Sequence, residues 1–214
     1  MGVRKLLVSA SKTANQCQRN WDRKKEISQL VKYTLINIAT NLPTKQNQAY
    51  YHLLVSDNPV YNKNIYKCSI DGENKGTKDR NSQVDSPLLF MYLKNEYTGD
   101  NFKYAGHEKK DSIQQQHHVH NFNATLSAGI SSGAVALAAN QLGMRTGFCC
   151  CYDTELLKNY LKSIGYTLDS HIITMLGIGY PNTNFHSNVV LKDESNDILR
   201  YVERYDKKVT YTIL

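Results

Sequence analysis

Apolar residues recur every three or four positions along residues 23–41, the first strongly patterned segment of the chain. The members of this apolar set are Ile27, Leu30, Val31, Leu35 and Ile38. Their spacing predicts an amphipathic helix with one face against a core. Asp22 is a suitable N-cap, with Glu26 in the first turn, and Pro43 stops the helix.

Short apolar runs predict the strands. Their ranges are 51–55, 87–93, 146–152 and 171–181. The second and fourth are apolar without alternation, which is typical of strands buried on both faces. Near the end of the chain, residues 208–214 alternate Val209, Tyr211 and Ile213 with threonines, so we expect a further short strand that pairs with a sheet edge.

Two more helices are expected after the first. Residues 123–144 are apolar nearly all round, which predicts a buried position. Small residues that would let another backbone approach closely are Ala128, Gly129, Ser132, Gly133, Ala136 and Ala139. Gly143 is a natural C-cap for this helix, and residues 153–166 form the next one with Asp153 as N-cap.

Two long polar stretches separate these elements. Residues 69–86 contain glycines and predict a surface loop. Residues 95–120 are polar again, and because loops of this length are usually functional, we expect a lid. The mixed helices and strands, with no internal repeat, predict one α+β domain over residues 1–214.

The charge and hydropathy of the chain limit the kinds of partner to be expected. The chain has 26 basic and 19 acidic residues, a formal net charge of +7. That surplus suits phosphates or anionic substrates, or is the solvated surface of a lysine-rich chain. The lysines are scattered and form no basic helix face, so we expect no nucleic-acid partner. No apolar run reaches the length of a membrane span and no signal peptide is visible, so we expect no membrane association.

The cysteines indicate a reducing environment. Cys17, Cys68 and the run Cys149, Cys150 and Cys151 make an odd number without metal-type spacing. Three consecutive cysteines cannot all pair with one another, so we expect free thiols and a cytoplasmic protein. Cys149 is interpreted as a small apolar residue of a buried strand.

A histidine cluster ends the second polar stretch. His118 and His120 could share one face of a strand, but no acidic or cysteine partner lies nearby in the sequence. We therefore expect no metal site, and His117 or His120 is expected to line a substrate mouth.

A short polar elbow, residues 43–47, joins the first helix to the first strand. Its irregular backbone would leave N–H and C=O groups free for the edge of a heteroaromatic ligand. The alternative is an ordinary helix-to-strand turn in which Asn47 bonds its own backbone. The residue pattern leaves both interpretations open.

Four segments together resemble the FMN-dependent nitroreductases. "NQCQRNWD" is similar to the N-terminal basic segment of that family, and "LPTKQNQAY" to its proline-containing elbow. "AGISSGAVALAANQLGMRTGF" is similar to its central dimer helix, and "LGIGYP" to its penultimate strand. They occur in the family's order and cover about residues 15–181.

The resemblance implies FMN as cofactor and assigns its contacts. Pro43, Thr44 and Lys45 would present main-chain groups to the flavin ring, with Asn47 close by. The main chain of Cys150 and Cys151 would approach the flavin N5 edge.

The same resemblance implies a phosphate clamp, which this chain matches only in part. Arg19 stands at the second basic position and Cys17 at a serine position, whereas the first basic position holds Asn15. His186 lies where the family has a later basic pair. The cation expected near flavin N1/O2 would be Arg80 or Lys78.

The fold implied is nitroreductase-like α+β, with a central, mainly antiparallel sheet flanked by helices, in an intertwined homodimer. The C-terminal arm, residues 208–214, would cross to the partner's sheet. The activity implied is an FMN-dependent NAD(P)H oxidoreductase that passes hydride by a ping-pong route to a nitroaromatic, quinone or similar acceptor. The alternative is a flavin-binding or flavin-free dimer of this fold with lost or divergent activity, such as flavin fragmentation or dehalogenation.

Overall fold

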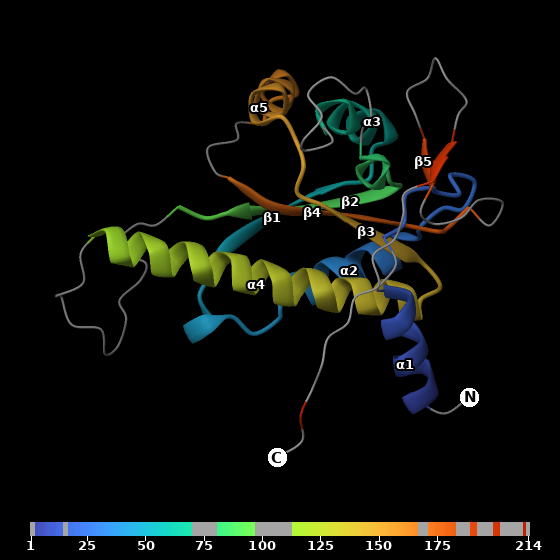
Figure 1. Ribbon diagram of the computed structural model, residues 1–214, viewed down its shortest axis with the longest axis horizontal. Helices are drawn as coiled ribbons and strands as arrows, with labels where there is room; N and C mark the ends of the chain where they lie inside the picture. The colour runs from blue at the N-terminus through green and yellow to red at the C-terminus, as the bar shows by residue number, and fades with distance from the viewer. Residues whose placement is uncertain are drawn as a thin grey trace.

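A four-stranded antiparallel sheet forms the centre of the structure, with helices on both faces (Figure 1). The structure is a computed structural model that describes residues 3–14, 17–69, 81–96, 113–166, 171–182, 189–191, 199–201 and 212. The sheet order is β1-β2-β4-β3, and every pairing in it is antiparallel. These strands are β1 (Tyr51–Ser56), β2 (Leu88–Lys94), β3 (Arg145–Cys149) and β4 (Ile172–Gly179).

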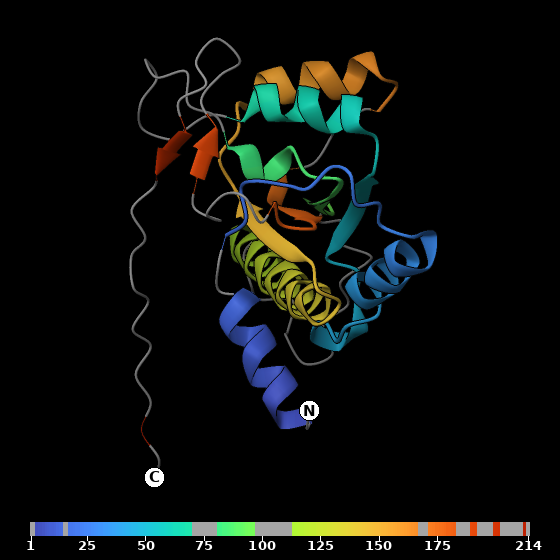
Figure 2. The same cartoon turned by 90° about the vertical axis from the view of Figure 1, so that its right-hand side faces the viewer.

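Helices cover the two faces of the sheet as separate layers (Figure 2). On one face lie α3 (Pro59–Cys68) and α5 (Thr154–Ser163), and on the other lie α2 (Gln29–Thr40) and α4 (Ile113–Gln141). Helix α1 (Val3–Ala14) packs against α4. A separate two-stranded antiparallel pair joins β5 (Val189–Leu191) to β6 (Leu199–Tyr201).

The central strand β2 divides the core in two. Its odd-numbered residues Leu89, Met91 and Leu93 pack in the cluster beneath α3 and α5. Its even-numbered residues Leu88, Phe90 and Tyr92 pack in the cluster against α2 and α4. Successive strand side chains point to opposite faces, so an unbroken apolar run is what a strand between two helical layers requires.

Most expected elements are present, and the first helix is shorter at its start. Helix α2 begins at Gln29, and its N-cap is Ser28, whose Oγ accepts from the Val31 N–H at 3.4 Å. The expected start at residue 23 with Asp22 as N-cap is wrong. Segment 17–27 is instead tied to the sheet, because Trp21 pairs with Pro181 and the Asp22 N–H donates to the Tyr180 carbonyl at 2.8 Å.

Helix α4 is longer than expected, and the correction concerns its start. It begins at Ile113, so the histidine cluster is helical and not part of an unstructured loop. A polar residue occupies a core-facing position here, which hid the helical period from the sequence pattern. In the part of α4 that was not expected, residues 113–122, the buried polar residue is His120. The remainder of the expected lid, residues 97–112, lies outside the described residues.

Two helices were not expected. Helix α3 has a readable start signal, since Asn58 Oδ1 accepts from the Val60 and Tyr61 N–H groups and Pro59 occupies the first turn. Helix α1 contains only a short apolar run, Leu6, Leu7 and Val8. Of the expected C-terminal strand, Thr212 alone is described, so that strand lies outside the described residues.

Helix α4 also bears on the expectation of no membrane association. Among the described residues it is the one helix long and apolar enough to cross a membrane by length and composition. Half of its most apolar window is buried inside the structure. A core helix of a soluble fold meets the same test, and α4 covers one face of the sheet as such a helix does.

Candidate functional site

Arg19 is the centre of a hydrogen-bond network between the N-terminal segment and the end of β3. Its Nη1 donates to Gln83 Oε1 at 2.8 Å and to Asn81 Oδ1 at 3.4 Å. Gln83 Nε2 in turn donates to the Phe148 carbonyl of β3 at 3.1 Å and to Asn81 Oδ1 at 3.3 Å. Both amide residues belong to the short turn that contains the 3-10 helix η2 (Ser82–Val84). We call Arg19, Asn81, Gln83 and the Phe148 carbonyl the Arg19 network.

Backbone pairing brings Arg19 to this place. Cys17 forms a parallel bridge with Thr146, and the Gln18 N–H donates to the Thr146 carbonyl at 2.8 Å. Two residues after Arg19, the Trp21 indole N–H donates to the Ser82 carbonyl at 3.1 Å. The segment therefore lies along β3 with both sides of Arg19 fixed.

Gly147 makes this close layering possible. A Cβ at Gly147 would collide with the Gln18 carbonyl oxygen and stand 2.6 Å from Gln83 Cβ. Gly177 of β4 is equally crowded, because an added Cβ would collide with the Gln83 carbonyl oxygen. The missing side chains let the N-terminal segment and η2 pack directly on the sheet backbone.

The charge of Arg19 has no counter-charge in this network. A guanidinium stays protonated in proteins, and here its acceptors are two neutral amide oxygens. Among the described residues no carboxylate forms an ion pair with it. Arg19 is half-buried, so its charge is only partly screened by water. The arrangement suits an anion.

Three of the buried polar atoms that lack hydrogen-bond partners in the described residues belong to residues that flank the network in the chain or pair with its segment. They are Asn20 Nδ2, Ser82 Oγ and Thr146 Oγ1. Buried polar atoms are normally hydrogen-bonded, and a bound ligand is one way to satisfy them. Neutral donors beside an uncompensated guanidinium are chemically suited to a phosphate with a polar ligand attached.

The nearby thiols leave the positive charge of Arg19 intact. Burial raises the pKa of the Cys17 thiol, although Arg19 opposes the shift. Burial also raises the pKa of Cys149 to about 12. Both groups are therefore neutral near pH 7. Cys150 and Cys151, by contrast, are exposed just after β3.

The elbow is a closed turn in this structure. It contains the 3-10 helix η1 (Lys45–Asn47), in which Asn47 takes a left-handed φ of 54°. Thr44 Oγ1 donates to the Gln48 carbonyl at 2.7 Å, and the Asn47 N–H donates to the Thr44 carbonyl at 3.1 Å. Pro43 directly precedes the turn. The geometry is compatible with both the turn and the ligand-loop interpretations.

A single chain does not bring the elbow to the Arg19 network. In both ribbon views η1 lies below α4 and away from β3 (Figures 1 and 2). The contacts of Tyr50, which follows the elbow, are with the other end of α4: its ring lies 5.6 Å from that of His120. A site that uses both regions therefore requires two chains.

The two candidate substrate histidines differ in environment. His117 is exposed on α4, whereas His120 is buried at 2 % exposure with its Nε2 2.6 Å from the Asn95 carbonyl. Burial lowers the pKa of His120. The described residues contain no group of three His, Cys, Asp or Glu side chains arranged for a metal. A substrate role for either histidine stays a prediction.

Three expected contacts fall outside the described residues: Asn15, Arg80 and His186. Lys78, the alternative to Arg80, lies outside them as well. The turn before β2 does contribute to the site, but through Asn81 and Gln83, which sequence reasoning missed. Uncharged amides carry little signal in a sequence, and their pairing with Arg19 spans more than sixty positions.

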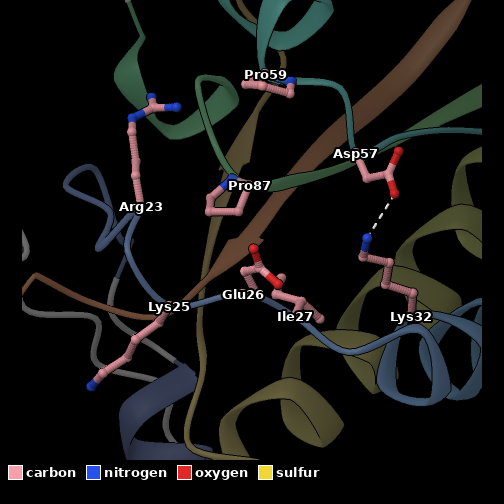
Figure 3. A pocket seen from close by; sticks show the side chains of 8 residues that line it. All are labelled: Arg23, Lys25, Glu26, Ile27, Lys32, Asp57, Pro59 and Pro87. Atoms are coloured by element: carbon pink, nitrogen blue, oxygen red, sulfur yellow. Dashed lines mark hydrogen bonds and ion pairs between the residues drawn. The ribbon is translucent and has the colours of Figure 1, made fainter.

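A pocket of about 560 Å³ lies around Arg23 (Figure 3). In the sequence, Trp21 separates Arg23 from Arg19. The lining residues of the pocket are Arg23, Lys25, Glu26, Ile27, Lys32, Asp57, Pro59 and Pro87. Here the cations have carboxylate partners. Arg23 Nη2 is 2.7 Å from Asp85 Oδ2, and Lys32 Nζ is 2.7 Å from Asp57 Oδ2. The Lys32 hydrogen bond lowers the pKa of Asp57.

Comparison with known proteins identifies the fold. No family model and no curated protein matches the sequence. Solved structures do match: the chain is similar to a nitroreductase with bound FMN from Bacteroides fragilis NCTC 9343, at 16 % identity and a TM-score of 0.61. That match covers 97 % of this chain and 98 % of the other.

Two further structures give the same result. An NAD(P)H:FMN oxidoreductase from Staphylococcus epidermidis ATCC 12228 matches at 16 % identity and a TM-score of 0.59, covering 86 % of this chain and 88 % of that one. CLA-ER, an enone reductase of gut-bacterial fatty acid saturation metabolism, matches at 16 % identity and a TM-score of 0.56, covering 92 % and 93 %. The chain therefore has the nitroreductase fold, as its sequence segments predicted.

Proposed function

We propose that this chain is an FMN-dependent oxidoreductase that uses NAD(P)H to reduce an electrophilic acceptor. The single observation that carries the proposal is Arg19, a half-buried guanidinium held by two amide oxygens and without a carboxylate partner in the described part of the chain. The nitroreductase fold of similar proteins, one crystallised with FMN, supports FMN as the phosphate-bearing ligand.

The residues of the chain fit the cofactor in defined roles. Arg19 would bind the phosphate, with Cys17 at the neighbouring position. The main chain at Cys150 and Cys151 would lie along the ring. When bound, FMN supplies the hydride acceptor and donor between NAD(P)H and the second substrate. The protein then has to bind and orient the substrates and exclude water, so this chemistry needs no acid–base pair of side chains.

A homodimer completes the proposed site. Helix α4 presents an apolar face to solvent, on which Phe122 is 63 %, Leu126 47 % and Ile130 44 % exposed. Gly129 and Gly133 lie on the same face, and a Cβ added at either would meet nothing within 4 Å. A second copy packed on this face by two-fold symmetry would cover the apolar side chains. It would also let Pro43 to Asn47 of the partner subunit reach the flavin.

Assembly can be tested on two matched leucine-sized positions. Ile130→Lys places a charge in the proposed interface and should convert the dimer of about twice 24.4 kDa into monomer. Leu156→Lys on α5, 52 % exposed and outside that face, should leave the dimer intact. Light scattering at micromolar concentration distinguishes these masses. An unaltered mass for Ile130→Lys would move the interface elsewhere.

The acceptor is proposed at the level of chemical class. A nitroaromatic, a quinone or an activated alkene is electron-poor and can take hydride from a reduced flavin. An enone reductase among the structurally similar proteins supports the breadth of this class. His117 and His120 stay the proposed substrate contacts, with the burial of His120 favouring an indirect role.

A spectrum of the purified protein tests the function. Yellow protein that is bleached by NADPH or NADH and recovers its colour with a quinone supports the oxidoreductase. Yellow protein that neither nucleotide reduces would support the alternative, a flavin-binding dimer with divergent activity. Colourless protein that takes up no added FMN in a fluorescence titration would contradict the cofactor assignment itself.

A further inference from the structure

Exposure separates the five cysteines into two classes. Cys150 and Cys151 follow β3 directly and are exposed, whereas Cys68 and Cys149 are buried and Cys17 is half-buried. Only the first two are freely reached by a soluble reagent. The thiolate is the reactive form, and burial works against it by raising the pKa of Cys17 and Cys149.

The two exposed thiols are too close along the chain to pair with each other. Adjacent Cα atoms are about 3.8 Å apart, while disulfide-bonded residues usually need about 4.4–6.8 Å between Cα atoms. Cys149, the other neighbour, points to the core and its Sγ lies 3.4 Å from the Cys151 carbonyl. Cys150 and Cys151 are thus expected to stay separate thiols, open to an external partner.

Cys150 and Cys151 lie close in the chain to the proposed flavin site, so modification of these thiols would affect ligand binding. Cys150 is two residues beyond Phe148, whose carbonyl accepts from Gln83 in the Arg19 network. Its Sγ lies 3.5 Å from Thr174 Oγ1 and 3.7 Å from the Ile173 carbonyl of β4. The proposed function places the flavin ring along the main chain of Cys150 and Cys151, so a group attached to either exposed sulfur would compete with the ring for that space.

We propose that Cys150 and Cys151 form a modification site for small disulfides, and that modification of this site and binding of FMN exclude each other. The second half of this proposal rests on the proposed function. In the chemical step, a cysteine thiolate attacks one sulfur of the small disulfide, whose S–S bond breaks as the mixed disulfide forms. The departing half leaves as a thiolate and takes up the proton that the cysteine lost. Excess small thiol reverses the reaction, so cofactor loading would follow the thiol–disulfide state of the surroundings.

Thiol counting tests the modification site without any cofactor. Native protein mixed with dithiodipyridine should show two fast-reacting thiols per chain, matching the two exposed cysteines. Cys150→Ser and Cys151→Ser should each remove one, while Cys149→Ser, the matched control within the run, should leave both. Fast thiols that survive both exposed substitutions, or no fast thiols in protein that is folded by circular dichroism, would overturn the site.

FMN protection tests the exclusion. Saturation with FMN should slow labelling of Cys150 by about tenfold or more, because labelling then waits for the ligand to leave. Protein first converted to the mixed disulfide should bind FMN more weakly and recover after dithiothreitol. Unchanged labelling in protein that demonstrably binds FMN would refute the exclusion and leave the proposed function standing. Protein that binds no FMN would contradict the proposed function, while the thiol count would still decide the modification site.

Discussion

Arg19 and Arg23 lie four positions apart in one segment but have opposite kinds of partner. Arg23 forms an ion pair with Asp85 at 2.7 Å and also donates to the Asp85 carbonyl at 2.7 Å. Within the described residues, Arg19 donates only to the neutral side-chain oxygens of Gln83 and Asn81. The two residues share the same short stretch of chain and the same chemistry, so their different surroundings come from the fold.

The comparison indicates that Arg23 has a structural role, because its charge is paired, whereas the charge of Arg19 is available to a ligand. Arg23, which lines the pocket, forms an ion pair with Asp85, and Lys32 forms one with Asp57 (Figure 3). Around Arg19 the acceptors within the described residues are two neutral amide oxygens, so its charge has no counter-charge there. An anion is therefore expected to bind at Arg19, and the pocket at Arg23 is expected to be structural.

The largest effect is expected at the glycine beneath the Arg19 network. Gly147→Ala should lower the free energy of unfolding by about 1–3 kcal/mol, since the added methyl meets backbone and a buried side chain. In the Ile130→Lys background, which removes the proposed dimer contact, Gly133→Ala on α4 should be neutral or stabilising, because the new Cβ meets nothing within 4 Å in the chain. Urea denaturation measures both. Equal effects at the two glycines would contradict the close packing of the N-terminal segment on β3.

The next effect concerns affinity for FMN. Arg19→Ala should weaken binding by about ten- to a hundredfold, because a lost hydrogen bond to a charged group costs about 1.5–3 kcal/mol. Arg23→Ala is the matched control and should leave affinity unchanged, since its charge is already paired. Fluorescence titration gives both values. Similar losses for the two arginines would remove the distinction between the two regions.

A single charge at Asn81 should make Arg19 resemble Arg23. Asn81→Asp keeps the acceptor oxygen that bonds Arg19 and Gln83 but adds a carboxylate beside the guanidinium. FMN affinity should fall by about tenfold, equivalent to about 1.4 kcal/mol. Circular dichroism checks that the fold is retained. Affinity equal to that of the original chain would show that the net charge at Arg19 does not matter.

The smallest effect is a pH dependence at the structural pocket. Lys32 lowers the pKa of Asp57 from its usual 3.8, so the pair stabilises the fold above about pH 4 and loses this contribution as the pH falls through the lowered value. The Asp57 side chain is 48 % exposed, so solvent screening limits the effect to a few tenths of a kcal/mol, roughly. Asp57→Asn should remove this part of the acid dependence in urea unfolding curves. An unchanged curve would mean that the pair contributes nothing to stability.

The fold was largely predictable because its signals are local. The apolar runs of β2 and β4 mark strands between two helical layers, and Asp153 marks the start of α5, where its Oδ1 accepts from two N–H groups at 3.0 Å. The errors lie where tertiary contacts override local pattern. Trp21 is hydrogen-bonded to Ser82, and this contact keeps the segment preceding α2 from extending that helix. His120 is buried in the core, at a position where the sequence pattern would lead one to expect an apolar residue.

The candidate site was predictable only in part. Arg19 and Cys17 were proposed from the resemblance of the N-terminal segment; the structure places both beside β3, and their role toward a ligand stays a prediction. Asn81 and Gln83 could not be identified, because an amide becomes informative only when the fold brings it to a cation. The role proposed for the elbow needs a second chain, which no pattern within one chain can show.

The central claim is that Arg19 binds the phosphate of the cofactor, and flavins with and without that phosphate test it directly. Affinities of the original chain and of Arg19→Ala should be measured by calorimetry for FMN and for riboflavin, which has the same ring but no phosphate. The account predicts a loss of about ten- to a hundredfold for FMN and no change for riboflavin. Equal losses for the two flavins would contradict it, because Arg19 would then be supporting the fold or the ring and not the phosphate.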